Sequence, residues 1–340
     1  MKINESTFGE VSGKAVIAFT LSNDNGMLVT LLNYGGIIKE LYFPNAKGEL
    51  ISCVQTFDTL QGYIGDASYR GAIVGRYANR IGHGTFTLNG QQYTLDKNGG
   101  EHNLHGGHSG FHKKLWQAST QESSETASVT FTLSSHDGEG GFPGNISVEA
   151  CYTLNQQNEL TLVIKATTDK ETPLSFTQHA YFTLSNDEKV GSTLLHIDAK
   201  KVTDADSTLL PTGDLVDVAD TPFDFTSFSA IKERAEQANS HPLFERVGGY
   251  DHNYVLQPAH ENSPQATVKA PDTGLTMELF TSLPGLQFYT GSLKDSIQLG
   301  ALCLEPQHFP DAPNKPSFPN CFVKPGETYE ETIRYKFSAE

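Results

Sequence analysis

A carboxylate and an imidazole lie close together in the segment LEPQHFPDAPN (304–314). An apolar run over residues 299–304 leads directly into Glu305, and Gln307 and His308 follow before a series of prolines. We expect a buried strand over 299–304 that holds Glu305 at its rigid end, as a catalytic base would require. Burying an unpaired carboxylate is unfavourable, so an exposed Glu at a strand end is the simpler alternative.

A second candidate is His179 in the segment PLSFTQHAYFTL (173–184). Strand alternation would place His179 and Tyr181 on the same face, between aromatic neighbours. A single His of this kind is more often a core imidazole that its neighbours satisfy. Two polar groups on one face instead indicate the wall of a site. A partly buried Glu and His can act as base and acid near neutral pH without a cofactor.

Three further segments carry polar residues that could hold hydroxyl groups. They are RGAIVGRYANRI (70–81), EHNLHGGHSGFH (101–112) and GGYDHNYVL (248–256). Aromatic side chains such as Tyr181, Phe182 and Tyr289 could stack on the apolar face of a sugar. Together with the acid–base pair, these residues suit proton transfer on a neutral polyol.

Metal and nucleotide chemistry find little support in these motifs. His102, His105 and His108 are spaced at intervals of three, but the loop is rich in Gly and lacks Cys, so no metal is expected. The sequence has no Walker A motif, no G-x-G-x-x-G and no G-x-S-x-G elbow. We therefore predict an enzyme without a cofactor.

Composition excludes several partners. The 340 residues carry a net charge of -16, which opposes binding to nucleic acid and to anionic membranes. The N-terminal residues are polar and contain no apolar signal core, and no apolar run reaches the length of a membrane span. These features predict a cytoplasmic protein whose partner is a small neutral molecule.

Short alternating segments separated by turn residues dominate the chain. In GTFTLNGQQYTL (84–95), Asn89-Gly90 supplies the turn between two alternating runs, which predicts a β-hairpin. Helical periodicity is rare and is clearest over residues 227–239, with a further turn near TFDTLQGYIG (56–65). We predict an all-β protein: one large antiparallel β-sandwich domain over residues 1–340, with one or two short helices.

Six segments resemble the aldose 1-epimerase (mutarotase) family, of the galactose mutarotase type. The resemblance covers nearly the whole chain, and the segments occur in the family's order and near its spacing. Each segment alone is weak evidence for the resemblance, whereas the six segments together are specific for this family. The segments are GRYANRI (75–81), NLHGG (103–107), TQHAYFTL (177–184), YDHNYVL (250–256), LQFYTG (286–291) and LEPQHFPDAPN (304–314).

The resemblance implies a large antiparallel β-sandwich and the interconversion of α and β anomers of a free aldose. It implies that Glu305 is the general base at the C1 hydroxyl and His179 the general acid at the ring oxygen. Other positions are implied to hold or line the sugar. They are Arg76, Asn79, His105, Tyr181, Asp251 and Gln287.

The chain departs from the family pattern Asn-x-Thr-Asn-His-x-Tyr-Phe-Asn-Leu around the acid. Ser175, Gln178 and Thr183 replace the three Asn residues. Galactose or glucose is the expected substrate type, and the departures leave room for another aldose, including a disaccharide such as maltose. Two alternatives on the same fold are a hexose-6-phosphate epimerase and a non-catalytic sugar-binding protein.

Overall fold

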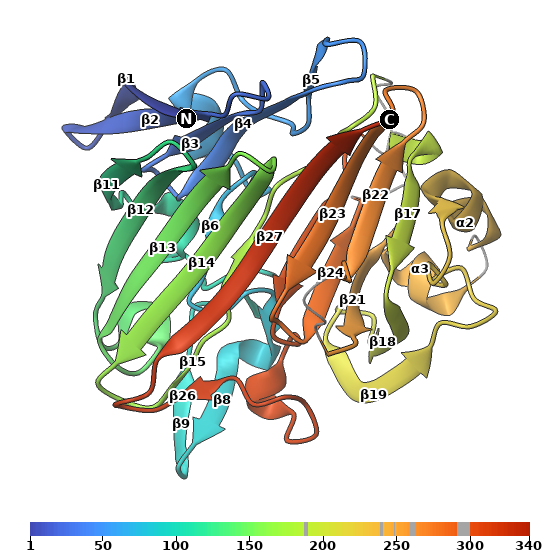
Figure 1. Ribbon diagram of the computed structural model, residues 1–340. Coiled ribbons are helices and arrows are strands. Elements are labelled where there is room, and N and C mark those ends of the chain that lie inside the picture. Colours follow the sequence, from blue (N-terminus) through green and yellow to red (C-terminus); the bar gives the residue numbers. More distant parts are fainter. Residues whose placement is uncertain (187–189, 239–240, 248, 259–262, 291–299) are drawn as a thin grey trace.

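Antiparallel strands form most of the structure, a computed structural model that describes residues 1–186, 190–238, 241–247, 249–258, 263–290 and 300–340. The largest sheet has nine strands (Figure 1). In β13, alternate side chains are buried, so one face of this sheet packs on the core and the other meets solvent. In sheet order the strands are β11 (Gln117–Glu122), β12 (Thr126–Ser135), β13 (Ile146–Asn155), β14 (Glu159–Thr168), β27 (Tyr329–Ala339), β23 (Leu275–Thr281), β22 (Ala266–Ala270), β17 (Leu194–Ile197) and β20 (Ser229–Ala230).

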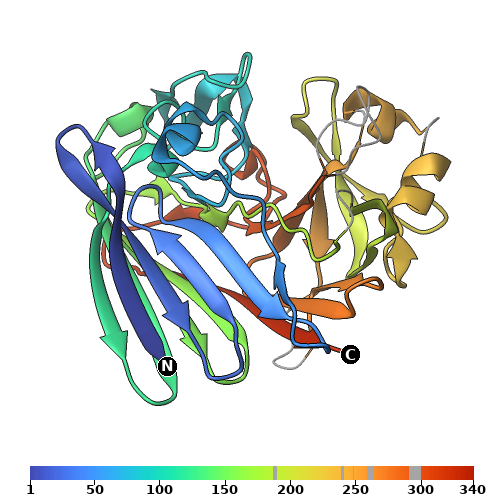
Figure 2. The ribbon, with the colours of Figure 1, turned by 90° about the horizontal axis from the view of Figure 1, so that it is seen from above.

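Two five-stranded sheets cover the buried face of the large sheet. Figure 2 shows the N-terminal one, in blue, against the green strands of the large sheet. It consists of β1 (Lys2–Val11), β2 (Lys14–Ser22), β3 (Leu28–Leu32), β4 (Ile37–Pro44) and β5 (Leu50–Ser52). The other has the order β19 (Pro211–Asp217), β18 (Ala199–Ala205), β21 (Asp251–Leu256), β24 (Gly285–Tyr289) and β25 (Cys303–Gln307).

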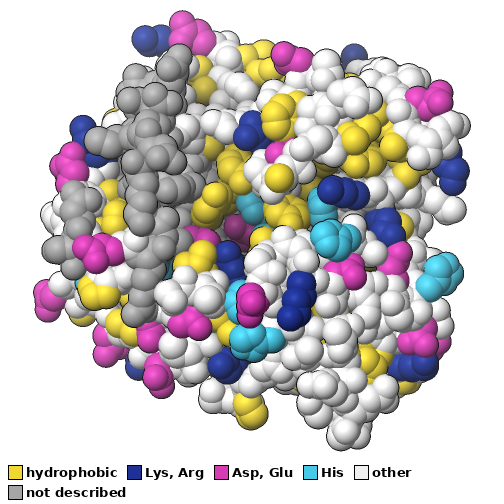
Figure 3. All heavy atoms as spheres, turned by 180° about the vertical axis from the view of Figure 1, so that it is seen from behind, with side chains coloured by type: hydrophobic (Ala, Val, Ile, Leu, Met, Phe, Trp, Pro, Cys, Tyr) yellow, Lys and Arg dark blue, Asp and Glu magenta, His cyan; other side chains and the backbone are white. Residues whose placement is uncertain are grey.

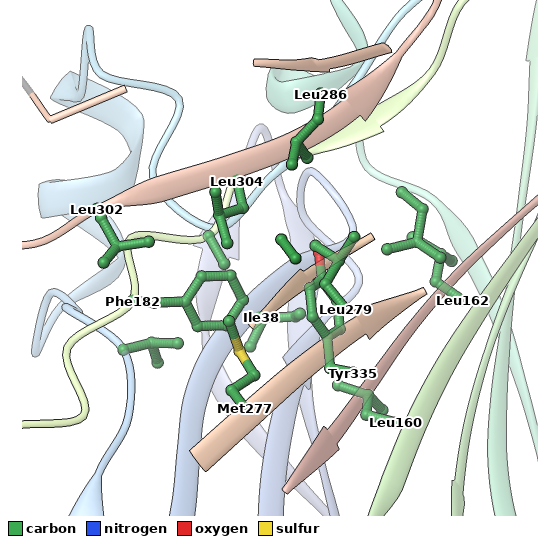
Figure 4. Close-up of a cluster of buried hydrophobic side chains, with 14 of the residues drawn as sticks. Ile38, Leu160, Leu162, Phe182, Met277, Leu279, Leu286, Leu302, Leu304 and Tyr335 are labelled. Atoms are coloured by element: carbon green, nitrogen blue, oxygen red, sulfur yellow. The ribbon is translucent and has the colours of Figure 1, made fainter. Parts of the chain in front are cut away.

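A continuous apolar core joins the three sheets. Phe19 of β2 meets Phe131 of β12 edge to face, with ring centroids 5.9 Å apart. Leu286 and Leu304, from the sheet that contains β25, face Leu279 and other side chains of the large sheet (Figure 4). Full burial of such a side chain contributes about 1.5–3 kcal/mol. This core fixes the backbone of β24 and β25, whose opposite face is polar.

Short strand pairs connect the sheets. The pair of β8 (Thr85–Leu88) and β9 (Gln91–Thr94) is the predicted hairpin, and its turn residues Asn89 and Gly90 have φ of 52° and 79°, as a type I′ turn requires. The other pairs are β7 (Arg80–Ile81) with β10 (Asn103–Leu104), β16 (Thr177–Gln178) with β6 (Ile73–Val74), and β15 (Thr172–Pro173) with β26 (Phe322–Val323).

The prediction of an all-β antiparallel sandwich is confirmed. The described residues include three short helices, α1 (Leu60–Gly65), α2 (Ile231–Gln237) and α3 (Pro242–Val247). The predicted helix over 227–239 is shorter than expected because β20 occupies Ser229–Ala230, and Asn239 lies outside the described residues. None of the described helices has the length and apolarity needed to cross a membrane.

The predicted strand over 299–304, with Glu305 at its end, is wrong. Leu299 lies outside the described residues, and β25 begins at Cys303 and continues through Glu305 and Pro306 to Gln307. A proline is tolerated there because β25 is the edge strand of its sheet, where no further strand needs the missing N–H. Glu305 therefore lies in mid-strand, held by neighbours on both sides along the chain.

Two glycines with the same backbone conformation should tolerate substitution differently. Gly106 and Gly90 have φ of 83° and 79°, but an added Cβ would lie 2.1 Å from the Gly75 carbonyl oxygen at Gly106 and would meet nothing within 4 Å at Gly90. We expect Gly90→Ala to lower the free energy of unfolding by about 1–2 kcal/mol. Gly106→Ala should lower it by a further 1–3 kcal/mol or so from overpacking. Urea unfolding followed by circular dichroism measures both, and equal losses would contradict the close approach.

Candidate active site

Three adjacent strands, β21, β24 and β25, present a polar face on the side away from the core. Pairing places Asp251 opposite Tyr289, and Gln287 opposite both Asn253 and Glu305. Residues paired across strands project to the same side of a sheet, so these side chains form one surface. The alternate residues, such as Phe288 and Leu304, point into the core. A polar site is thus built directly on a rigid apolar support.

A cavity of about 220 Å³ opens over this polar face. The face turned away from the viewer in Figure 1 is hollowed near its centre, where His, acidic and basic side chains gather between hydrophobic ones (Figure 3). Drug-sized ligands usually occupy pockets of about 300–1,000 Å³, so this one suits a smaller molecule. The lining residues are Ala67, Ser68, Tyr69, Asn79, Arg80, Leu104, His105, His179, Tyr181, Asp251, Tyr289 and Glu305.

His179 and Glu305 face each other inside the cavity. His179 Nε2 lies 3.5 Å from Glu305 Oε2, and both side chains are almost fully buried. Burial lowers the pKa of His179 to about 4. Burial, with a smaller effect of Asp251, raises the pKa of Glu305 well above its usual value, while Arg80 opposes this change. Within the described residues, Glu305 Oε2 accepts no hydrogen bond. The pair is therefore poised to exchange protons with a bound molecule.

His105 is a fixed hydrogen-bond donor. Its Nδ1 accepts a hydrogen bond of 3.1 Å from the backbone N–H of Asn79, so the proton of the neutral ring must be on Nε2. Burial, together with the nearby His179, Arg80 and His112, lowers the pKa of His105 well below its usual value. His105 thus stays neutral and offers an N–H to the cavity.

The tautomer of His105 also bears on metal binding. His105, His179 and Glu305 offer donor atoms that lie within 4.8 Å of one another, close enough to approach one ion. A metal-binding His normally donates its second ring nitrogen to an acceptor, which leaves the first with a free lone pair. His105 does the opposite, because Nδ1 is the acceptor and Nε2 carries the proton. The donor set therefore does not fit a metal in this tautomer.

A polar network holds Asp251 beside the cavity. Gln287 Nε2 donates to Asp251 Oδ1 over 2.6 Å, and Gln307 Nε2 donates to the Gln287 side chain over 3.2 Å. Arg80 lies 4.0 Å from the other carboxylate oxygen of Asp251. One side of the cavity thus presents a guanidinium and a carboxylate whose positions are set in advance.

The structure does not bring Arg76 into this cavity, and the predicted sugar-holding role for it is corrected. Its guanidinium is buried and donates to Ser135 Oγ and to the backbone carbonyls of His136, Pro143 and Gly144. Arg80, four residues later, lines the cavity, because the pairing of β7 with β10 sets Arg80 opposite Leu104 and next to His105. Spacing alone could not distinguish these two arginines of the same motif.

The other predicted site residues lie in or next to the cavity. Asn79, Tyr181 and Tyr289 line the cavity. Gln287 lies behind this lining and donates a hydrogen bond to Asp251, which lines the cavity. The rings of His179 and Tyr181 are stacked, with centroids 5.2 Å apart, as their expected common face implied. Phe182 instead belongs to the core, so its suggested contact with a sugar is wrong (Figure 4).

Tyr69 is a cavity residue that sequence reasoning missed. It adopts φ of 57°, and its ring lies 4.5 Å from that of His105 and 6.0 Å from that of His179. A Tyr between Ser68 and Arg70 carries no periodic signal, because it lies in a turn rather than in a strand. Only the neighbouring motif at 70–81 could have drawn attention to it.

Comparison with known proteins places this geometry in a family. The sequence model of the family described as aldose 1-epimerase matches residues 18–336. The chain belongs to the aldose 1-epimerase family. It is 35% identical to a galactose mutarotase of Bos taurus over 99% of both chains, and 34% identical to an aldose 1-epimerase of Escherichia coli K12 over 99% of this chain and all of the other.

Solved structures of aldose 1-epimerases share the fold over almost the full length. A galactose 1-epimerase from Lactobacillus acidophilus has a TM-score of 0.88 at 27% identity and covers 99% of both chains. An aldose epimerase homologue from C. elegans has a TM-score of 0.86 at 31% identity, covering 96% of this chain and 99% of the other.

The three departures from the aldose 1-epimerase pattern lie outside the cavity lining. Ser175 Oγ accepts a hydrogen bond of 3.1 Å from the backbone N–H of His308. The backbone N–H of Thr183 donates to the Cys53 carbonyl over 3.0 Å. The Gln178 side chain donates to the Gly71 carbonyl. The side chains of Ser175 and Gln178 thus bond to backbone groups beside the site rather than line the cavity.

The two arginines should differ in their effect on stability. Arg76→Met would leave several buried acceptors without a donor, and each unsatisfied group costs about 1–3 kcal/mol. Arg80→Met removes one long ion pair, at 4.0 Å, and one weak hydrogen bond to the Asn79 side chain, at 3.4 Å, so its loss of stability should be smaller. We expect a clearly lower melting temperature for Arg76→Met alone, measured by differential scanning calorimetry. Equal shifts for the two variants would contradict the structural role given to Arg76.

Proposed function

We propose that this protein interconverts the α and β anomers of a free aldose, with Glu305 as general base and His179 as general acid. The observation that carries the proposal is the separation of 3.5 Å between His179 Nε2 and Glu305 Oε2, two buried side chains that line one cavity. The C1 hydroxyl and the ring oxygen of an aldose are bonded to the same carbon. One acid and one base at this spacing can therefore address both oxygens together.

The proposed reaction starts from the form of the pair in which His179 holds the proton and Glu305 is ionised, the reverse of the placement that burial alone favours. It moves one proton at each of these oxygens. Glu305 removes the proton from the C1 hydroxyl while His179 protonates the ring oxygen, so the bond between C1 and the ring oxygen breaks. The open aldehyde rotates about the C1–C2 bond. The ring then closes with the roles reversed: His179 removes the proton that it gave, and Glu305 returns one to the oxygen on C1. Both residues end in their starting states.

Other cavity residues are proposed to hold the sugar in place. His105 donates from Nε2, Arg80 donates to hydroxyl or ring oxygens, and Asp251 accepts from hydroxyl groups. The rings of Tyr181 and Tyr289 supply apolar surface for the C–H face of the sugar. The volume of the cavity fits a single sugar unit, so a disaccharide would place only its reducing unit here.

The two alternatives are less well supported. In the described lining, a phosphoryl group would face the carboxylates of Asp251 and Glu305 with Arg80 as the cation, whereas phosphate sites rely on clustered cations. A protein that only binds sugar needs no buried acid–base pair. Relatives that share about a third of the sequence over its full length are named mutarotases and epimerases, which favours catalysis.

Two further predictions from the sequence accompany this proposal. We propose that residues 1–340 act as one mutarotase-like domain, which the family match over residues 18–336 supports. A cytoplasmic location stays a prediction from the polar N-terminal residues.

Removal of either catalytic group should nearly abolish activity. We expect Glu305→Gln and His179→Asn to lower kcat by about 10²–10⁴-fold, the usual contribution of a general acid or base. Polarimetry on freshly dissolved α-D-galactose, α-D-glucose and maltose measures this against the uncatalysed rate. Unchanged melting temperatures provide the control for folding. Normal turnover in Glu305→Gln would refute its assignment as the base.

The pH profile should be bell-shaped, because catalysis requires one proton on the pair of His179 and Glu305. As pH falls towards the lowered pKa of His179, about 4, a second proton binds and the base is lost. As pH rises beyond the raised pKa of Glu305, the last proton leaves and the acid is lost. We expect kcat/KM, measured by polarimetry, to be highest between these two limits. A steady rise across the whole range would contradict the pair.

A further inference from the structure

Gln178, the residue that precedes His179, has a side chain that is completely buried and bonded outside the cavity. Its amide nitrogen donates to the carbonyl oxygen of Gly71. Because a carbonyl can only accept, the nitrogen and not the oxygen of the amide must face Gly71. The amide oxygen of Gln178 accepts no hydrogen bond within the described residues, so the bond to Gly71 is the contact that fixes this side chain.

Gly71 is held from several directions. Its N–H donates to the His179 carbonyl over 2.8 Å, and its carbonyl accepts from Ile38 N–H over 2.8 Å as well as from Gln178. It adopts φ of 70°, and an added Cβ would lie 2.4 Å from the Ile38 carbonyl oxygen. Both backbone polar groups of Gly71 therefore tie the turn at residues 69–71 to its neighbours, including the segment that carries His179.

The other end of this turn is Tyr69, which reaches into the cavity. Its ring contacts the rings of His105 and His112, each at 4.5 Å between centroids, and stacks on His179 at 6.0 Å with an interplanar angle of 28°. Aromatic pairs of this kind contribute about 0.5–1.5 kcal/mol each beyond the burial of their surface. Tyr69 thus limits how far the rings of His179 and His105 can rotate.

We propose that Gln178 is a positioning residue for the reaction: through Gly71 it holds Tyr69 against His179 and His105. The inference rests on the proposed function and assigns a purpose to a residue at which the chain departs from its family pattern. Asn at this position is one methylene shorter, so its amide would not make the same bond to Gly71 from the same backbone. The longer amide and the turn therefore form one unit in this chain.

The experiment compares Gln178→Asn and Gln178→Met with a matched change in the same short strand, Thr177→Val. The Thr177 hydroxyl is buried and has no hydrogen-bond partner within the described part of the chain, so its removal should leave the kinetics unchanged. For both Gln178 variants we expect kcat to fall roughly tenfold while KM changes less than twofold. We also expect a shift of the acidic limb of the pH profile, since the surroundings of His179 change.

A double-mutant cycle with Tyr69→Leu tests whether Gln178 acts through Tyr69. Tyr69→Leu alone should lower kcat and shift the same limb of the pH profile. If the two residues form one unit, the double variant should be little worse than either single variant. Losses that simply multiply would overturn the proposal, as would a lower melting temperature with unchanged kcat and pH profile.

The outcomes separate this inference from the proposed function. If the wild-type protein does not accelerate mutarotation, the proposed function itself fails. If the wild type is active and Glu305→Gln is not, but the Gln178 variants keep normal kinetics, only the positioning role fails. Should the Gln178 variants not fold, Tyr69→Leu with an unchanged kcat and pH profile would refute the proposal on its own.

Discussion

The constraint on which the rest of the site depends is the burial of Glu305, one of whose oxygens accepts no hydrogen bond within the part of the chain that the structure describes. A carboxyl group in this setting resists ionisation, so its charge must be supported when it acts as a base. His179 at 3.5 Å and Arg80 nearby can provide that support. The surrounding fold keeps these groups in position and buries both side chains.

The rigidity of the site comes from the two faces of one sheet. On β21, β24 and β25, polar side chains project towards the cavity, while the alternate residues pack against the large sheet. A small displacement of Glu305 would therefore disturb the packing of Leu304, and the core resists this change. The apolar core in this way fixes the distance between the proposed acid and base.

The segments opposite this sheet are irregular, and they are held by hydrogen bonds rather than by long ladders. Arg76, from the motif GRYANRI, donates hydrogen bonds to the backbone carbonyls of Pro143 and Gly144. His105 is fixed by the backbone of Asn79, and the turn of Gly71 by the segment at His179. Loops tied in this manner can present several side chains to a ligand with little freedom to move.

The sequence alone determined the all-β class and the hairpin at Asn89-Gly90, and it indicated Glu305 and His179 as candidate site residues, because alternation, turn chemistry and unusual polar residues are local signals. It could not distinguish Arg76 from Arg80, could not show that Glu305 lies within an edge strand and did not reveal Tyr69. These features depend on strand pairing and on contacts between segments far apart in the chain. Only the tertiary structure could decide them, since the position of a side chain relative to a cavity follows from register and packing rather than from its own residue type.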